Sequence, residues 1–491
     1  MGSPRDAGGH LVGQVPDLHW RQQQSCARCR TPRGLTAYGT RSGRRRTCVR
    51  RPDRAGHRVG RIVSEASQSI PARYTGDRNV IVGARWARSP GVPPDVVSWS
   101  RANVATQNED AWRKPMAELP RRLVLGGTAA LTAIGTLRRA RAYAGTPLRI
   151  GVLNDPNGPF ADNGGIGCVY AARLAAEEFG NSVLGRPIEI IAADNQNKPD
   201  IAAAISREWI DTQGVEAIVD GASSGAGLAI QEVTREKRKL FLIVGPATTE
   251  LTGRYCSPFG FHFAYDTYAL AKGTASAVVA DGGTEWFFIT PDYTFGTAME
   301  RDASRFVRAA GGKVLGSVRH PLGTADYSSY LLQAQSSGAT VVALANAGAD
   351  MENCLKQAAE FGIGRGNQRV AALVTFITDV LAVGLPAAKG LNLTTSFYWD
   401  LNDATRAWTR RFRALKNRPP TMLQAGAYSS VRHYLEAVRA VGSTDSVAVA
   451  DKMRAMPVND MYNNNVTIRP DGRVLHMMYL MRVKSPEESR Y

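Results

Sequence analysis

Two pairs of adjacent hydroxyl residues, Ser223-Ser224 and Thr248-Thr249, have the residue types and the setting to bind an anion. Each pair follows a short aliphatic run typical of a buried strand and precedes a region that can form a helix. Hydroxyls beside the unpaired N–H groups of a helix start suit a carboxylate, which also gains from the helix dipole. A Ser or Thr at such a position is also an ordinary helix cap. Two such pairs at consecutive strand ends leave a carboxylate site and simple capping as equal alternatives.

The run Gly-Ala-Ser-Ser-Gly that begins at Gly221 also fits the G-x-S-x-G pattern of a serine nucleophile elbow. Acids and a histidine follow in the hydrolase order, for example Asp379 or Asp400 and then His433. Against catalysis, the elbow is expected to follow only the third strand rather than to sit mid-sheet, and no His-Gly-Gly oxyanion motif precedes it. His433 is expected on the surface of a helix rather than in a loop. We therefore expect no enzyme, and keep a secreted serine hydrolase that uses Ser223 as the alternative.

Dinucleotide and metal sites have weaker support. The glycines from Gly164 to Gly167 lack the third glycine of the dinucleotide fingerprint, and the Gly-rich run 362–366 follows a predicted helix, where a helix C-cap explains it. The pair Cys26 and Cys29 has no second ligand pair at zinc-finger spacing, and the seven histidines are scattered. We therefore expect no cofactor, no catalytic zinc and no structural metal.

The basic character of the chain is confined to its front. The 491 residues carry a net charge of +18, from 61 basic and 43 acidic residues. Residues 1–115 account for +13 and residues 116–145 for +4, so the remaining 346 residues are nearly neutral at +1. The global charge therefore gives no support for nucleic-acid binding by the folded part, and we expect no nucleic-acid partner.

Residues 1–115 are rich in Arg, Gly, Pro and Ser and show no sustained apolar period, so we expect them to be disordered. One interpretation is a basic arm that binds nucleic acid. The other is upstream sequence that is not part of the natural product. We favour the second, because a complete export signal begins at Met116.

A signal peptide is expected at residues 116–144. The pair Arg121-Arg122 ends a short basic region, an uncharged apolar stretch follows, and Ala142-Tyr-Ala144 matches a small-x-small cleavage site. The paired arginines before a weakly hydrophobic stretch are typical of a twin-arginine signal, with general secretion as the alternative. The stretch is short for a bilayer span, and no other stretch reaches ~18 apolar residues, so we expect a soluble, exported protein.

From residue 147 onward, short β-branched runs alternate with helical patterns of about ten to fifteen residues, which is typical of βαβ units and parallel sheets. The rhythm runs twice and breaks near residues 261–268. This predicts an α/β fold of two Rossmann-like lobes with parallel central sheets. Strands are expected at 148–153, 188–193, 215–219, 240–244, 286–290, 313–319, 340–344 and 370–375, with helices between them at 169–179, 199–212, 226–237, 296–310, 327–336 and 350–361.

Two later helices, expected at 404–415 and 422–441, look like a second visit to the first lobe. The expected domains are therefore lobe one at 145–265 and 397–456, lobe two at 266–396, and a third crossing with the end of lobe two at 457–491.

Ligands of open α/β sheets lie at the carboxyl ends of the strands, so the loops after the predicted strands hold the remaining candidates. These residues are mostly aromatic or polar, and they are Phe160, Tyr293, Phe295, Asn346, Asp350, Phe376 and Asp379.

The run from Ile150 to Phe160, Ile-Gly-Val-Leu-Asn-Asp-Pro-Asn-Gly-Pro-Phe, resembles the opening strand and first ligand loop of type I periplasmic solute-binding proteins. These form the leucine/isoleucine/valine-binding family that feeds ABC importers. Further segments extend the resemblance over about residues 147–485, and they are 191–200, 245–252, 292–296, 357–362 and 397–400. The resemblance implies two lobes joined by a three-crossing hinge, with a ligand in the cleft between them.

The resemblance also implies roles for the candidate residues. From the first lobe, Ser223, Ser224 and Thr248 would hold the ligand carboxylate, with Phe160 and Thr249 beside them. From the second lobe, Tyr293, Phe295, Asn346 and Phe376 would approach the ligand. Asp379 or Asp350 would face an ammonium group, although neither aligns convincingly with the acid of the family. The ligand would be a branched-chain or other amino acid, or an aromatic or aliphatic carboxylate.

By the same resemblance the protein would act in the periplasm as a monomer. Closure of the cleft around the ligand would allow it to dock on the membrane permease of an ABC importer, and no bond would be made or broken. The sequence ends at Tyr491, earlier than the resemblance leads us to expect, which suggests that a final segment of the second lobe is missing.

Overall fold

The computed structural model describes residues 145–489. The predictions of a disordered basic extension at 1–115 and of a signal peptide at 116–144 fall outside the described residues and stay predictions.

The first sheet has six strands in the order β2-β3-β1-β4-β5-β6. All neighbours run parallel except β2, which is antiparallel to β3. The strands are β1 (Leu148–Asn154), β2 (Ser182–Val183), β3 (Arg186–Asp194), β4 (Val215–Asp220), β5 (Leu240–Ile243) and β6 (Gly260–His262). Strands β1, β4 and β5 are almost entirely buried and mostly apolar, because helices cover both faces of a parallel sheet.

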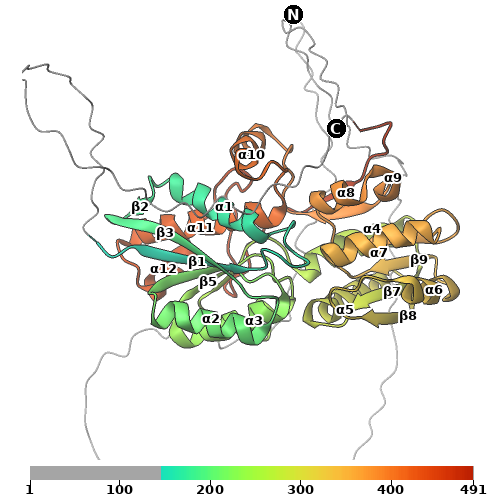
Figure 1. Ribbon diagram of the computed structural model, residues 1–491, viewed down its shortest axis with the longest axis horizontal. Coiled ribbons are helices and arrows are strands. Elements are labelled where there is room, and N and C mark those ends of the chain that lie inside the picture. The colour runs from blue at the N-terminus through green and yellow to red at the C-terminus, as the bar shows by residue number, and fades with distance from the viewer. Residues whose placement is uncertain (1–144, 490–491) are drawn as a thin grey trace, which may run out of the picture. The chain divides into compact units, whose positions relative to one another are not determined.

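Helices α2 (Pro199–Asp211) and α3 (Ser224–Lys237) cover one face of this sheet, while α1 (Gly165–Glu177) and α11 (Met422–Val441) cover the other (Figure 1). Two separate groups of buried apolar side chains fill the interfaces on the two faces. Helix α12 (Ser446–Ala455) packs on α11, and α10 (Asp403–Lys416) packs on α1.

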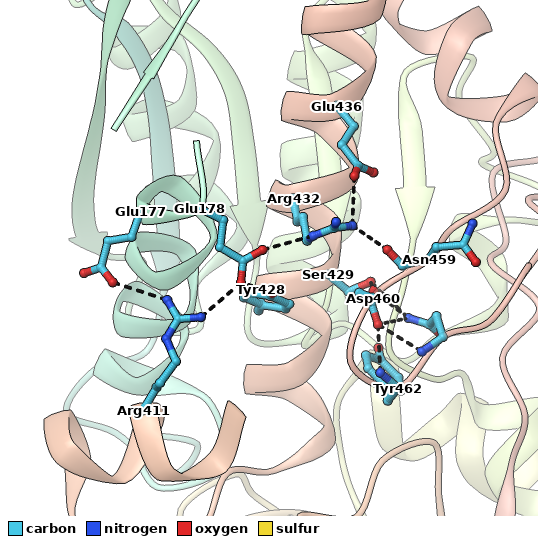
Figure 2. Close-up of polar contacts among 11 residues, drawn as sticks. Glu177, Glu178, Arg411, Tyr428, Ser429, Arg432, Glu436, Asn459, Asp460 and Tyr462 are labelled. Carbon is cyan, nitrogen blue, oxygen red and sulfur yellow. Dashed lines mark hydrogen bonds and ion pairs between the residues drawn. The ribbon is translucent and has the colours of Figure 1, made fainter. Parts of the chain in front are cut away.

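A polar network centred on Glu178, the residue directly after α1, ties α10 and α11 to the end of α1 (Figure 2). Glu178 accepts hydrogen bonds from Arg411 of α10 at 3.0 Å and from Tyr428 of α11 at 2.5 Å. It also pairs with Arg432 of α11 at 3.1 Å, and Arg432 in turn pairs with Glu436 at 2.9 Å. These contacts join segments more than 230 residues apart, so the late helices complete a layer that begins with α1.

The second sheet has four parallel strands in the order β10-β9-β7-β8. They are β7 (Glu285–Pro291), β8 (Lys313–His320), β9 (Val341–Leu344) and β10 (Arg369–Ala372). One face buries apolar side chains of α4 (Thr267–Ala280) and α5 (Thr294–Ala309), and the other buries those of α6 (Ser328–Ser336) and α7 (Ala349–Glu360).

Smaller elements complete the described chain. They are the 3₁₀ helix η2 (Thr249–Leu251), helices α8 (Ile377–Val383) and α9 (Leu385–Ala388), and the antiparallel pair β11 (Asn392–Thr395) and β12 (Tyr479–Arg482). No helix in residues 145–489 is both long and apolar enough to cross a membrane.

The predicted α/β fold with two parallel sheets is confirmed. We call the six-stranded sheet with its helices the first lobe and the four-stranded sheet with its helices the second lobe; the exact domain limits stay predictions. The small strands β2, β6, β11 and β12, the helices α4, α8, α9 and α12 and the 3₁₀ helix η2 were not predicted. Helix α1 begins at Gly165 rather than at residue 169, because the glycines there allow close packing: a Cβ on Gly167 would lie 2.4 Å from the Gln424 amide of α11.

Candidate ligand-binding site

A pocket lies at the carboxyl ends of β1 and β4 and is lined by residues of both lobes. The second-lobe wall comes from the segments that begin α5, α7 and α8, which is where the strand-end rule places a ligand. Six of the eleven candidate residues line it, namely Phe160, Ser223, Ser224, Tyr293, Phe295 and Phe376. The other five, which make the contacts described below, are Thr248, Thr249, Asn346, Asp350 and Asp379.

The two hydroxyl pairs meet beside this pocket. Ser223 is the N-cap of α3, and its Oγ accepts a hydrogen bond from the Ala226 N–H at 3.3 Å. Thr248 caps η2 in the same way by accepting from the Glu250 N–H at 3.3 Å. Ser224 Oγ accepts from the Thr248 N–H at 3.1 Å, which ties the two loops together. Ser223 therefore both caps α3 and lines the pocket, whereas Thr248 caps η2 and does not line the pocket.

The turn that presents these serines has an unusual backbone. Asp220, Gly221 and Ala222 have φ angles of 82°, 102° and 52°, and this left-handed run turns the chain sharply from β4 into α3. The Asp220 carboxylate secures the turn by accepting from Asn154 Nδ2 and from the Gly245 N–H, both at 2.9 Å. Burial raises the pKa of Asp220. Backbone strain held in place by such bonds is typical of functional sites.

Asp155 is the second buried acid in the wall. It accepts from the N–H groups of Gly158 at 2.6 Å and Phe160 at 3.0 Å, and from Asn197 Nδ2 at 2.7 Å. These bonds order the loop that carries Phe160. Within the part of the chain that the structure describes, no Arg, Lys or His lines the pocket. An anionic ligand group would therefore be held by hydroxyls and backbone N–H groups rather than by a cation.

Five aromatic side chains also line the pocket, and they are Phe160, Tyr265, Tyr293, Phe295 and Phe376. Tyr265 and Phe376 meet edge to face across the lobes, with ring centroids 6.1 Å apart and an interplanar angle of 89°. Tyr293 and Phe295 lie 5.8 Å apart at 38°. Such a surface suits an apolar or aromatic ligand group.

Asn346 belongs to a separate polar cluster at the carboxyl end of the second sheet. Its Nδ2 lies 3.0 Å from Nε2 of His320 and donates to the Tyr327 hydroxyl at 3.4 Å. Asp350 accepts from the Gly323 N–H at 3.1 Å, and burial raises its pKa to about 6. These contacts order the loop after β8 and leave both Asn346 and Asp350 outside the pocket wall.

Asp379 and Thr249 make contacts between the lobes. The Asp379 carboxylate accepts from the Phe376 N–H at 2.8 Å and from Asn163 Nδ2 of the first lobe at 2.6 Å. Burial raises the pKa of Asp379 to about 8. The Thr249 hydroxyl donates to Asp302 of α5 at 3.3 Å. Both residues therefore hold the lobes together at the edge of the site.

The environment of Ser223 does not match that of a nucleophile. Besides its capping bond, its hydroxyl donates only a long bond of 3.4 Å to the Asn197 carbonyl. Two of our expectations about the hydrolase alternative were wrong. Strand β4 lies inside the sheet, because spatial order departs from chain order. His433 is 1% exposed rather than on a surface, because α12 covers it, and its Nε2 lies 2.9 Å from the Met453 carbonyl oxygen.

Sequence reasoning missed six residues of the pocket wall that carry side-chain chemistry or bulk, namely Asn154, Asp155, Asn163, Asp220, Tyr265 and Leu423. The strand-end rule could have found Asn154, Asp155 and Asp220, because each ends or follows a strand. Tyr265 lies where the rhythm of strands and helices breaks. No local signal marks Asn163, whose partners lie far along the chain.

No group of three or more His, Cys, Asp or Glu side chains in residues 145–489 is arranged to hold a metal ion. The expectation of no metal and no cofactor for the whole chain stays a prediction.

Comparison with known proteins assigns the fold to a family. The family model described as "Periplasmic binding protein" matches residues 147–488. The crystal structure of a periplasmic binding protein from Burkholderia mallei is 48% identical, with a TM-score of 0.69 over 70% of this chain and 92% of that one. A branched chain amino acid ABC transporter periplasmic ligand-binding protein from Burkholderia xenovorans is 40% identical, with a TM-score of 0.63 and the same coverage. Leu/Ile/Val-binding protein homolog 6 of Brucella abortus is 23% identical over 380 residues, which are 74% of this chain and 94% of that protein.

Proposed function

This chain belongs to the periplasmic binding protein family, and from that membership we propose that its pocket captures an amino acid with an apolar side chain. The chain is a substrate-binding component of an ABC transporter and not an enzyme. The identity of the ligand, the permease partner, the periplasmic location and the monomeric state are parts of the proposal.

The charge of the pocket wall carries the choice of an amino acid. Asp155 and Asp220 are each at most 2% exposed, and no basic side chain of the described residues lines the pocket beside them. A simple carboxylate would place another acidic group beside these two acids in a buried space, where charge repulsion is weakly screened. A zwitterion brings an ammonium group that offsets the acids. Its carboxylate can turn to the start of α3 at Ser223 and Ser224.

The aromatic side chains of the pocket indicate the nature of the ligand's side chain, its third group after the carboxylate and the ammonium group. An apolar side chain would pack against Phe160, Tyr293 and Phe376, which come from both lobes. Because these contacts exist together only when the lobes are closed, the ligand favours the closed state through its differential affinity. The closed form then docks on the permease, and the importer's ATPase supplies the work.

A second candidate ligand is an aromatic carboxylate, which the edge-to-face pair Tyr265 and Phe376 favours. The two candidates differ in the ammonium group. A thermal-shift screen of aliphatic amino acids, aromatic amino acids and benzoates tests them, since a ligand of the native state raises the melting temperature. Stabilisation by leucine, isoleucine or valine supports the proposal. Stabilisation by benzoates alone would replace it with the second candidate.

A further inference from the structure

The loop between β1 and α1 makes direct contacts with two helix starts of the second lobe. The Ala349 N–H, at the start of α7, donates to the Pro159 carbonyl oxygen at 2.9 Å. Asn163 Nδ2 donates to Asp379 Oδ1 at 2.6 Å and to Thr378 Oγ1 at 3.1 Å, both in α8. This loop therefore spans the two lobes beside the pocket.

Asn163 is held firmly from its own side. The Thr421 hydroxyl, at the N-cap of α11, donates to the Asn163 carbonyl oxygen at 2.5 Å. The side chain of Asn163 is 1% exposed and lines the pocket. Its Oδ1 is buried without a hydrogen-bond partner among the described residues. A buried amide oxygen without a donor is costly, so an unpaired one in a pocket wall points to a donor on the ligand.

We propose that Asn163 couples recognition of the ligand's ammonium group to closure of the lobes, with its oxygen accepting from the ligand and its nitrogen fixing Asp379. This inference rests on the proposed function as an amino-acid binder. Asp379 does not line the pocket; it is a positioning residue, because its bond to Asn163 Nδ2 in turn orients the Asn163 amide. An amide oxygen can only accept hydrogen bonds. The Asn163 oxygen can therefore form a hydrogen bond with a ligand that has an ammonium group, but not with a ligand that has only a carboxylate.

Gly348 provides a second way to test the contact between the β1–α1 loop and the second lobe. Its backbone has a φ of 60° and a ψ of −139°, and a Cβ there would lie 2.2 Å from the Pro159 oxygen and 2.9 Å from Asn163 Oδ1. The loop can seat against α7 only because this position has no side chain. Gly362 offers a matched control, because it has a φ of 77° and a Cβ there would meet nothing within 4 Å.

The experiment compares leucine with 4-methylpentanoate, which is leucine without its ammonium group, by calorimetry on the unaltered protein and on Asn163→Ala. Loss of a hydrogen bond to a charged group corresponds to about ten- to a hundredfold weaker binding. We expect Asn163→Ala to lose leucine affinity by this factor and to change 4-methylpentanoate affinity much less. An equal loss for both ligands, or no loss for leucine, overturns the inference while leaving the proposed function in place.

The variants Gly348→Ala and Gly362→Ala test the coupling to closure independently if Asn163→Ala does not fold. Small-angle scattering with saturating leucine should show compaction in Gly362→Ala and reduced compaction in Gly348→Ala, with weaker leucine binding in the latter. Equal compaction and affinity in the two variants would overturn the coupling to closure. If the unaltered protein binds no amino acid, the proposed function fails, and the inference fails with it.

Discussion

Arg473 and Asp266 form a buried ion pair at the junction of the two lobes. Nε of Arg473 lies 2.8 Å from Oδ2 of Asp266, and their side chains are 6% and 10% exposed. Asp266 also caps α4, the first helix of the second lobe, and Arg473 donates to the carbonyl oxygen of His262 at 3.0 Å. The pair therefore joins the first crossing between the lobes to a segment more than 200 residues later.

Removing one partner of this pair should destabilise the protein strongly. Arg473→Met leaves the Asp266 carboxylate buried without its cation, so we expect a loss of about 3–5 kcal/mol in the free energy of unfolding. Urea denaturation measures it. The double variant Arg473→Met with Asp266→Asn is the control, because it removes both charges and should recover part of the loss. A single variant as stable as the unaltered protein would show that the pair contributes little.

The serines of the pocket wall should matter for affinity. Ser223→Ala or Ser224→Ala removes a hydroxyl that can bond the ligand carboxylate, so binding should weaken about ten- to a hundredfold. Thr248→Ala is the matched control, because that hydroxyl lies outside the wall and caps η2. Its expected effect is a stability loss of about 1 kcal/mol with a smaller change in affinity. Calorimetry and thermal unfolding of the three variants separate the two effects, and unchanged affinity in both serine variants would remove the carboxylate site.

Buried histidines should make the free energy of unfolding depend on pH. Burial lowers the pKa of His262 to about 3, of His433 to about 4 and of His476 to about 3. Each is neutral in the folded state but takes up a proton in the unfolded state below about pH 6.5. The stability that a neutral histidine contributes is therefore present above that pH and is lost progressively as the pH falls towards the folded-state pKa.

The variant His262→Leu isolates one of these groups from the acids that titrate in the same range. Between pH 4 and 6, the free energy of unfolding of the unaltered protein should fall more steeply with acid than that of the variant, by about 1.4 kcal/mol per pH unit. Urea denaturation at several pH values gives both slopes. Parallel slopes would mean that His262 is protonated in the folded state as well.

Export should remove the front of the chain. The signal predicted at residues 116–144 leads us to expect a mature protein that begins at Gly145, with translation from Met116. N-terminal sequencing of the protein from its host tests both points. A mature species that retains residues 1–115 would contradict them.

The parts of the site that depend on local sequence patterns could be predicted, whereas the parts that depend on long-range contacts could not. Ser223, Tyr293 and Phe376 were found because the strand-end rule needs only the order of strands and loops. Asn163 was missed because its meaning depends on Asp379, 216 residues away in the sequence. His433 was expected on a surface because helix α12, which buries it, was not predicted.

Calorimetric titration of the purified protein with leucine, isoleucine and valine, and with benzoate in parallel, decides whether the pocket captures an amino acid. We expect saturable one-to-one binding of at least one of the amino acids, weakened in Ser223→Ala. Binding of benzoate with no binding of any amino acid would overturn the proposed function.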